Sequence, residues 1–503
     1  MVHYLLSAYI ALAASDGLPV NTPKSVGMSA TRLASIDRIV QRGIKAGGYP
    51  GASVVIGRRG YALFQKGFGK IGWTTSSSRV SADRTIYDLA SLTKVVGTTT
   101  AAMILFDQGK LDLDAPVHTY LPAFSGGAKD SVTVRQLLTH RSGLPAGRDL
   151  WRIARTPEEA RAAVLATDLT CRPGQCFIYS DLGADVLGFV IEAVAGESLD
   201  HFLHDRVFEP LGMNDTFFKP ADSVTYRVAP TEIAPPRGYP IRGEVHDENA
   251  YTLGGVAGHA GLFSTAADLS IFAQMMLNRG EYNGVRILSD SVVTLFTKRT
   301  AGTRALGWDT GDGDGGAGKF LDSRAYGHTG YTGTSIWLDP DREMFVLLLT
   351  NRVHAARARR PAKVISDVRA DLADAAAAAV IDNPENVISM PRTFRADKAV
   401  GWNRPVRATR SRSSRSRTAA RKPVASKSTA KKTTSKASTA KKPAAKSSTA
   451  KSSTRKASTA KSSSAKSSTA KKSTASSSKS SAAKKKTTAA KPPTKKVAAK
   501  TGN

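Results

Sequence analysis

The stretch that decides the fold reads SLTKVVGTTTAAMILFDQG and covers residues 91–109. Ser91 and Lys94 stand three positions apart, so a helix places the hydroxyl and the amine on one face. The helix N-terminus adds partial positive charge beside the serine. A serine hydroxyl becomes a nucleophile when a base takes its proton, and a desolvated lysine can be neutral enough to do so. This stretch therefore predicts an apolar helix that opens with a reactive serine and ends at Gly109.

The Ser-x-x-Lys pattern is uninformative by itself, because a repeated Ser-Thr-Ala-Lys near the C-terminus also satisfies it. In the first 400 residues, however, Lys94 is the only one of 12 lysines with a serine three positions before it. The alternative interpretation is a helix cap followed by a surface lysine. Two further motifs favour the catalytic interpretation.

The second motif is Tyr179-Ser180-Asp181, and Tyr179 is the only one of the 13 tyrosines with Asn or Asp two positions later. A phenol held near Lys94 can exchange a proton with it, and so act as base in acylation and as acid toward the leaving group. The alternative is a core tyrosine in a loop.

The third motif is His328-Thr329-Gly330, which Tyr331 and a predicted strand follow. Glycine lets an edge backbone approach a substrate closely. The N–H after Gly330 and the N–H of Ser91 together would form an oxyanion hole.

These three motifs, at these intervals, resemble the serine β-lactamase and penicillin-binding-protein family. The resemblance covers residues 27–380 and favours the branch of class C β-lactamases, D-Ala-D-Ala carboxypeptidases and esterases, with further likeness at 137–144 and 254–262. It implies an acyl-enzyme mechanism with no cofactor. The implied catalytic residues are Ser91 as nucleophile and Lys94 and Tyr179 as the proton-transfer pair; the implied substrate-binding residues are Asp181, His328, Thr329, Gly330 and Tyr331.

Two positions depart from the family pattern. Asp181 stands where many members have Asn, and a carboxylate there would raise the pKa of Lys94 and move the base role toward Tyr179, unless Asp181 turns away. His328 stands where many β-lactamases have Lys, and histidine can be neutral near pH 7. We therefore expect no fixed cation from this strand and poor β-lactam hydrolysis.

Apolar patterns predict an α/β (α+β) fold in which both ends of the body supply an antiparallel sheet around an inserted, mostly helical region. A cleft is expected where the two regions join. The expected strands are 52–57, 61–66, 334–338 and 344–350, and the expected helices include 29–46, 160–166, 182–195, 266–279 and 362–380.

The remaining chemistry-bearing residues favour structural roles. His140 and His259 lie in Gly- and Ser-rich loops, where hydrogen bonds that fix the loop are the preferred interpretation. Cys171 and Cys176 are close enough for one disulfide in an oxidising compartment, but two reduced thiols are equally compatible. No zinc-ligand spacing, Walker sequence, dinucleotide fingerprint or G-x-S-x-G is present, so the sequence predicts no metal.

Charge divides the chain into a body and a tail. Residues 401–503 hold 30 of the 73 lysines and arginines and no acidic residue, and Ser-Thr-Ala-Lys recurs there every ten residues from 428. Because the repeat has no residue larger than alanine to bury against a neighbouring repeat, the region is expected to stay disordered. Its composition resembles linker-histone tails and predicts salt-sensitive binding to a polyanion, either nucleic acid or an anionic envelope polymer.

The sequence predicts a possible signal peptide and leader at 1–26, a hydrolase domain at 27–382, and a linker with the basic tail at 383–503. No apolar run reaches the length of about 18 residues that a transmembrane helix needs. The leading hypothesis is a periplasmic or secreted serine hydrolase acting on a D-amino-acid peptide, a small ester or, with less support, a β-lactam. The alternative is a non-catalytic polyanion- or muropeptide-binding protein of the envelope or, in the cytoplasm, of the nucleoid.

Overall fold

The computed structural model describes residues 17–300, 302–311, 316–354 and 362–401. Residues 1–16 of the predicted leader (1–26) and residues 402–503 of the predicted linker and tail (383–503) lie outside them. The helices are α1 (Ala30–Leu33), α2 (Ser35–Lys45), α3 (Thr100–Asp107), α4 (Val134–Leu138), α5 (Leu150–Ile153), α6 (Pro157–Leu165), α7 (Asp181–Ala195), α8 (Leu199–Leu203), α9 (Glu248–Thr252), α10 (Ala266–Leu277), α11 (Asp290–Thr297) and α12 (Lys363–Ala379). The strands are β1 (Gly51–Arg58), β2 (Tyr61–Gly69), β3 (Tyr87–Asp88), β4 (Phe217–Phe218), β5 (Leu262–Ser264), β6 (Glu281–Tyr282), β7 (Val285–Arg286), β8 (Asp309–Thr310), β9 (Tyr326–Thr329), β10 (Ser335–Asp339) and β11 (Met344–Thr350).

The main sheet joins the two ends of the body, as the sequence predicts. Its order is β2-β1-β11-β10-β9-β8, and all of its pairings are antiparallel. The central pairing, between β1 and β11, places Ala52 opposite Thr350 and Arg58 opposite Met344. The α/β fold class is therefore confirmed, with the helical region inserted between β2 and β8.

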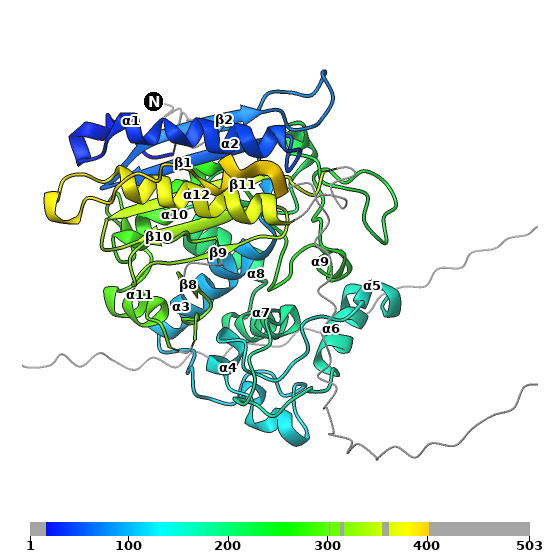
Figure 1. Cartoon of the computed structure of the whole chain (residues 1–503). Coiled ribbons are helices and arrows are strands. Elements are labelled where there is room, and N and C mark those ends of the chain that lie inside the picture. The colour runs from blue at the N-terminus through cyan, green and yellow to red at the C-terminus, as the bar shows by residue number, and fades with distance from the viewer. Residues whose placement is uncertain (1–16, 301, 312–315, 355–361, 402–503) are drawn as a thin grey trace, which may run out of the picture. The chain divides into compact units, whose positions relative to one another are not determined.

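Helices cover both faces of this sheet, so its central strands are apolar throughout rather than alternating with polar residues. Val54 of β1 and Val346 of β11 pack with α2 and α12 on one face. Their neighbours Val55 and Leu347 belong to the other core, which includes α10. Figure 1 shows α2 and α12 side by side along the sheet. Both ends of the body thus contribute to the helical layer that packs on β1 and β11, at the centre of the sheet.

The predicted helix at 29–46 is divided in two. The Ser29 side chain accepts a hydrogen bond from the Arg32 N–H and caps α1, and α2 starts after Ala34. The helices predicted near 160, 182, 266 and 362 are present as α6, α7, α10 and α12.

The helix that carries the first motif is less regular than its sequence predicts. It opens with a 3₁₀ turn at Ala90–Leu92, continues as a π-helical turn at Lys94–Thr99, and becomes α-helical only at Thr100. π-helical turns are rare in proteins, and those that occur often lie at functional sites. Among the described helices none is both long and apolar enough to cross a bilayer.

Candidate active site

Two hydroxyl groups anchor the turn before Ser91 to the loop that follows β9. The Thr332 hydroxyl donates to the Asp88 carbonyl at 2.8 Å, and the Thr334 hydroxyl donates to the Leu89 carbonyl at 2.9 Å. Ala90 has a positive φ of 48° and donates its N–H to the Asp88 carboxylate at 2.8 Å. The first and third motifs are therefore held together, although more than 230 residues of chain separate Ser91 from His328.

The Lys94 ammonium lies among oxygen acceptors from three segments. Its Nζ is 3.1 Å from Ser91 Oγ, 3.0 Å from the His259 carbonyl oxygen and 2.7 Å from Asp181 Oδ1. The side chain is only 4% exposed. The ammonium donates to two of these oxygens, those of Ser91 and His259, and forms an ion pair with Asp181, so its surroundings match the charged form.

The pKa values agree with this geometry. Burial disfavours the ammonium, but the Asp181 carboxylate, with a smaller contribution from Tyr179, raises the pKa of Lys94 above its ordinary value. Burial likewise opposes ionisation of Asp181, and the Lys94 charge holds the pKa of that carboxyl below its usual range. Of the two arrangements that the sequence left open for Asp181, the structure has the carboxylate facing Lys94.

The ring of Tyr179 lies between two cations and two histidines. It is 5.0 Å from Lys94 Nζ and 5.5 Å from the Arg304 guanidinium. Its centroid is 4.6 Å from that of His140 and 5.9 Å from that of His328. The structure thus brings Ser91, Lys94 and Tyr179 together, as the sequence analysis expected, although their catalytic roles remain a prediction.

His140 fixes the loop before Tyr179, which agrees with the role expected for it. Its Nδ1 accepts the Ser180 N–H at 3.1 Å, and its carbonyl accepts the Ile178 N–H at 2.9 Å. Burial, with the nearby Arg304 charge, lowers the pKa of His140 to about 3. The ring is therefore a neutral hydrogen-bond acceptor.

His328 is 3% exposed and neutral. Its Nδ1 faces the Thr329 carbonyl at 2.9 Å, which requires the proton on Nδ1. Nε2 is then a bare acceptor, and it has no hydrogen-bond partner among the described residues. Burial, together with the Arg304 and Lys94 charges, lowers the pKa of His328 well below its ordinary value. As expected, this strand position supplies no cation.

Ser91 opens into a cleft with two compartments. The first compartment has a volume of about 350 Å³ and is lined by Ser91, Tyr179, the 328–331 segment and Arg304. The second has a volume of about 470 Å³; its lining includes Ser91, Tyr179, Asp181 and Tyr331, together with acidic residues of 232–248. Gly330 allows the close approach that its motif predicts, since a Cβ there would overlap the Thr334 hydroxyl and the Leu89 carbonyl. All eight predicted site residues except buried Lys94 line the cleft.

Among the described residues, three cations of the first compartment were not predicted from the sequence: Arg304, Arg352 and Arg369. Arg304 is 12% exposed, and its Nε and Nη1 have no hydrogen-bond partner in the described part of the chain. Arg369 of α12 donates to the Gly330 and Thr334 carbonyls, both at 2.7 Å, and so braces the strand edge. Isolated arginines in loops and helices follow no motif, so only folding reveals them.

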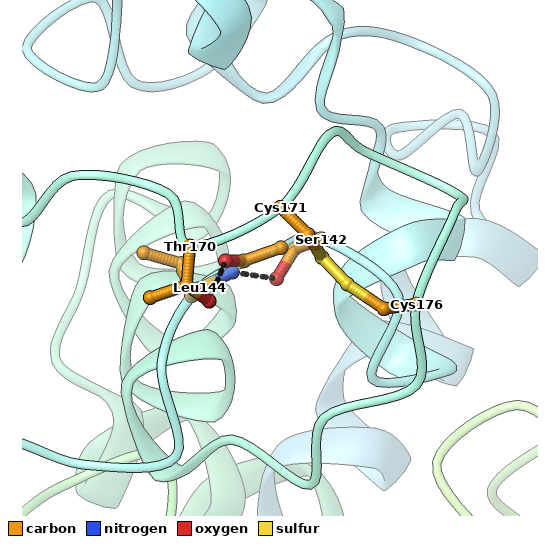
Figure 2. The surroundings of a disulfide bond; sticks show 6 residues. Ser142, Leu144, Thr170, Cys171 and Cys176 are labelled. Atoms are coloured by element: carbon orange, nitrogen blue, oxygen red, sulfur yellow. Dashed lines mark hydrogen bonds between the residues drawn. A yellow bond between two sulfur atoms is a disulfide. The ribbon is translucent and has the colours of Figure 1, made fainter. Parts of the chain in front are cut away.

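The two cysteines form a disulfide, which settles the alternative left open by the sequence. Figure 2 shows that it closes the 171–176 loop beside Ser142 and Leu144. Thr170 donates its N–H to the Gly143 carbonyl at 2.8 Å, and Gly174 donates to the Arg141 carbonyl at 2.7 Å. This closed loop leads directly into Tyr179.

The candidate metal ligands among the described residues are His204, Asp205 and Glu209. All three are exposed, and none lines the cleft. These three residues are therefore not part of the candidate active site.

The chain belongs to the β-lactamase family. The family model, described as Beta-lactamase, matches residues 36–369. A protein of Escherichia coli O157:H7 named "Putative D-alanyl-D-alanine carboxypeptidase" is 32% identical over 396 residues, 70% of this chain and 89% of that one. The family and this relative indicate an enzyme of the serine-hydrolase type.

Two solved structures share the fold. A penicillin-binding protein homologue from Caulobacter crescentus has a TM-score of 0.56 and 21% identity, and covers 70% of this chain and 99% of its own. EstCE1, described as a hydrolase with promiscuous acyltransferase activity, has a TM-score of 0.55 and 25% identity, and covers 69% and 99%.

Proposed function

We propose that this protein is a serine hydrolase that works through an acyl-enzyme on a D-amino-acid peptide ending in a free carboxylate. The observation that carries the proposal is the contact of Ser91 Oγ with Lys94 Nζ at 3.1 Å, at the junction of two cleft compartments. The name of the E. coli relative supports a carboxypeptidase rather than another hydrolase.

In the proposed reaction, Ser91 Oγ attacks the scissile carbonyl and its proton passes to Tyr179. Lys94 is held by hydrogen bonds to Ser91 and the His259 carbonyl and by its ion pair with Asp181, and it supplies positive charge as the tyrosine becomes anionic. The N–H groups of Ser91 and Tyr331 stabilise the oxyanion. Tyr179 then gives the proton to the departing amine, and water hydrolyses the acyl-enzyme by the same steps in reverse.

The carboxylate of the leaving residue is assigned to the first compartment. Its lining includes three arginines and one carboxylate, Asp309. Arg304 presents two guanidinium nitrogens without partners in the described chain, and arginine suits planar carboxylates because it can donate two parallel hydrogen bonds. This favours a peptide over a neutral ester as the natural substrate.

We further propose that the enzyme acts in the cell envelope. The disulfide between Cys171 and Cys176 favours an oxidising compartment, and a carboxypeptidase of this kind would find its substrate in peptidoglycan. The basic tail would then hold the enzyme on an anionic polymer.

The decisive experiment labels the pure, folded protein with a fluorescent penicillin and with a fluorophosphonate. The proposal expects labelling of the wild type and its loss in Ser91→Ala. Ser366→Ala is the matched control: Ser366 lines the same compartment, and we expect this variant to keep its labelling. Absence of labelling in the wild type would instead favour a non-catalytic binding protein.

A further inference from the structure

His259 is buried between two carboxylates on different helices. Its Nδ1 lies 2.6 Å from Asp185 Oδ1 on α7, and its Nε2 lies 2.9 Å from Asp247 Oδ1 at the start of α9. The histidine side chain is 2% exposed and that of Asp185 is fully buried. An ionised carboxylate only accepts hydrogen bonds, so both ring nitrogens carry protons and the ring is an imidazolium.

The backbone of this residue reaches the proposed catalytic lysine. The His259 carbonyl accepts from Lys94 Nζ at 3.0 Å, and the preceding carbonyl, of Gly258, accepts from the Thr98 hydroxyl at 2.6 Å. Lys94 and Thr98 both belong to the π-helical turn Lys94–Thr99. One loop therefore meets this turn at two points, and one of these is the Lys94 ammonium.

The loop that carries Gly258 and His259 packs closely against α7. A Cβ on Gly258 would overlap the Ala184 carbonyl, and Asp185 Oδ1 also accepts the His259 N–H at 3.3 Å. Asp247 in turn caps α9 by accepting the N–H groups of Asn249 and Ala250, both at 2.9 Å. The imidazolium is thus the bridge that neutralises the buried Asp185 carboxylate and the partly exposed Asp247 carboxylate, and it fixes the loop to α7 and to the start of α9.

We propose that His259 is a positioning residue for Lys94, in which the ion-paired ring holds the residue's own carbonyl against the lysine ammonium. Without the ring, Asp185 and Asp247 would face each other without a countercharge, and the loop would separate from α7. Lys94 would then lose one of its two hydrogen-bond acceptors and the orientation that brings it to Ser91. The inference rests on the proposed function, since it concerns a catalytic Ser91–Lys94 pair.

The test measures hydrolysis of p-nitrophenyl acetate by the full-length protein, with active sites titrated by the fluorophosphonate. For His259→Gln we expect kcat per titrated site to fall by about 10- to 100-fold while KM changes by less than about threefold. A merely structural role would lower the titre of active sites and leave kcat per site unchanged, and that result would overturn the proposal.

Asp185→Asn provides a second route if His259→Gln fails to fold. Asp185 lines neither described compartment, and its carboxylate contacts the His259 ring at 2.6 Å; we expect a smaller fall in kcat with KM unchanged. No fall in kcat per site would overturn the proposal.

Asp382→Asn is the control for general destabilisation. Asp382 forms an ion pair with Arg58 at 3.0 Å at the end of β1, so this variant should lower Tm and leave kcat per site unchanged. If the wild type neither labels nor hydrolyses the ester, the proposed function itself fails; if the wild type is active and the two variants match it, only the role of His259 fails.

Discussion

Arg304 lies where a single side chain can decide which substrates are accepted. Its guanidinium is packed over the rings of Phe177 and Tyr179, each at 5.5 Å, and its contact with Asp309 is long, at 3.7 Å. A buried cation that keeps unpartnered donors costs free energy unless a ligand satisfies it. A substrate carboxylate in the first compartment would do so.

We therefore predict that Arg304→Gln removes the preference for a free carboxylate. The measurement compares kcat/KM for a D-Ala-D-Ala peptide with that for its C-terminal amide, so that general effects on the enzyme cancel. A charge-assisted hydrogen bond contributes about 1.5–3 kcal/mol, so the ratio should fall by roughly 10- to 100-fold. Arg299→Gln, a change at an exposed arginine bound to the Gly311 carbonyl, is the control, and an unchanged ratio in Arg304→Gln would refute the assignment.

His140 makes stability depend on pH in a direction that its burial sets. Its pKa is about 3 in the folded protein against an ordinary value of 6.5. Between these pH values the unfolded chain binds a proton that the folded chain does not, so the free energy of unfolding falls as pH falls, by about 1.4 kcal/mol per pH unit.

His140→Asn should remove this dependence, and asparagine tolerates the positive φ of 56° at this position. Urea unfolding of both proteins at pH 7.0 and 5.5 measures the effect. We expect the wild type to lose stability relative to the variant by about 1 kcal/mol on that change. A difference between the two proteins that does not vary with pH would contradict the neutral, buried state of His140.

At the scale of the elements, the 171–176 loop shows how a short covalent closure supports a reactive residue. The disulfide stands three residues before Tyr179, and the loop is hydrogen-bonded to Arg141 and Gly143. In the chain-entropy account, closing so short a loop stabilises the folded state by about 2 kcal/mol.

Cys171→Ser/Cys176→Ser should therefore lower the free energy of unfolding by about that amount in urea titrations. Adding dithiothreitol should bring the wild type to the same value; equal stability with and without reductant would refute this.

The elements that sequence patterns predicted well are those with a simple apolar period. The strand at 344–350 and the helix at 182–195 agree with β11 and α7 to within one residue, because each has a buried face that its own composition defines. The helix after Ser91 was predicted as regular, and its π-helical turn was not foreseen. Lys94 points to acceptors from α7 and from the loop before β5, and such long-range contacts override local propensity.

Local sequence patterns likewise predicted some residues of the candidate site, but they did not predict those whose roles depend on long-range contacts. Ser91, Tyr179 and His328 were found because each belongs to a short motif that resembles a family. Arg304 and the bridging role of His259 depend on partners far away in the sequence, so no local pattern marks them. His259 was assigned a loop-fixing role, and the structure agrees with that role while adding the contact to Lys94.

At the scale of the whole molecule, charge and fold are separated along the chain. The body pairs much of its charge internally: Arg395 with Asp371 and Asp374, and Arg58 with Asp382. Residues 402–503 contribute 30 basic side chains and no acidic one. Catalysis and polyanion binding should therefore be separable by one cut after Gly401, where the described body ends.

We predict that deleting residues 402–503 leaves hydrolysis of p-nitrophenyl acetate unchanged, because the described residues that line the cleft all lie before position 370. The same deletion should abolish binding to polyanions, measured with a DNA duplex and with a wall teichoic acid. For the full-length chain the logarithm of the affinity should fall linearly with the logarithm of salt concentration, because binding releases counterions. Loss of ester turnover on deletion would mean that the catalytic body extends past Gly401, and salt-independent binding would mean that the tail recognises its partner by something other than charge.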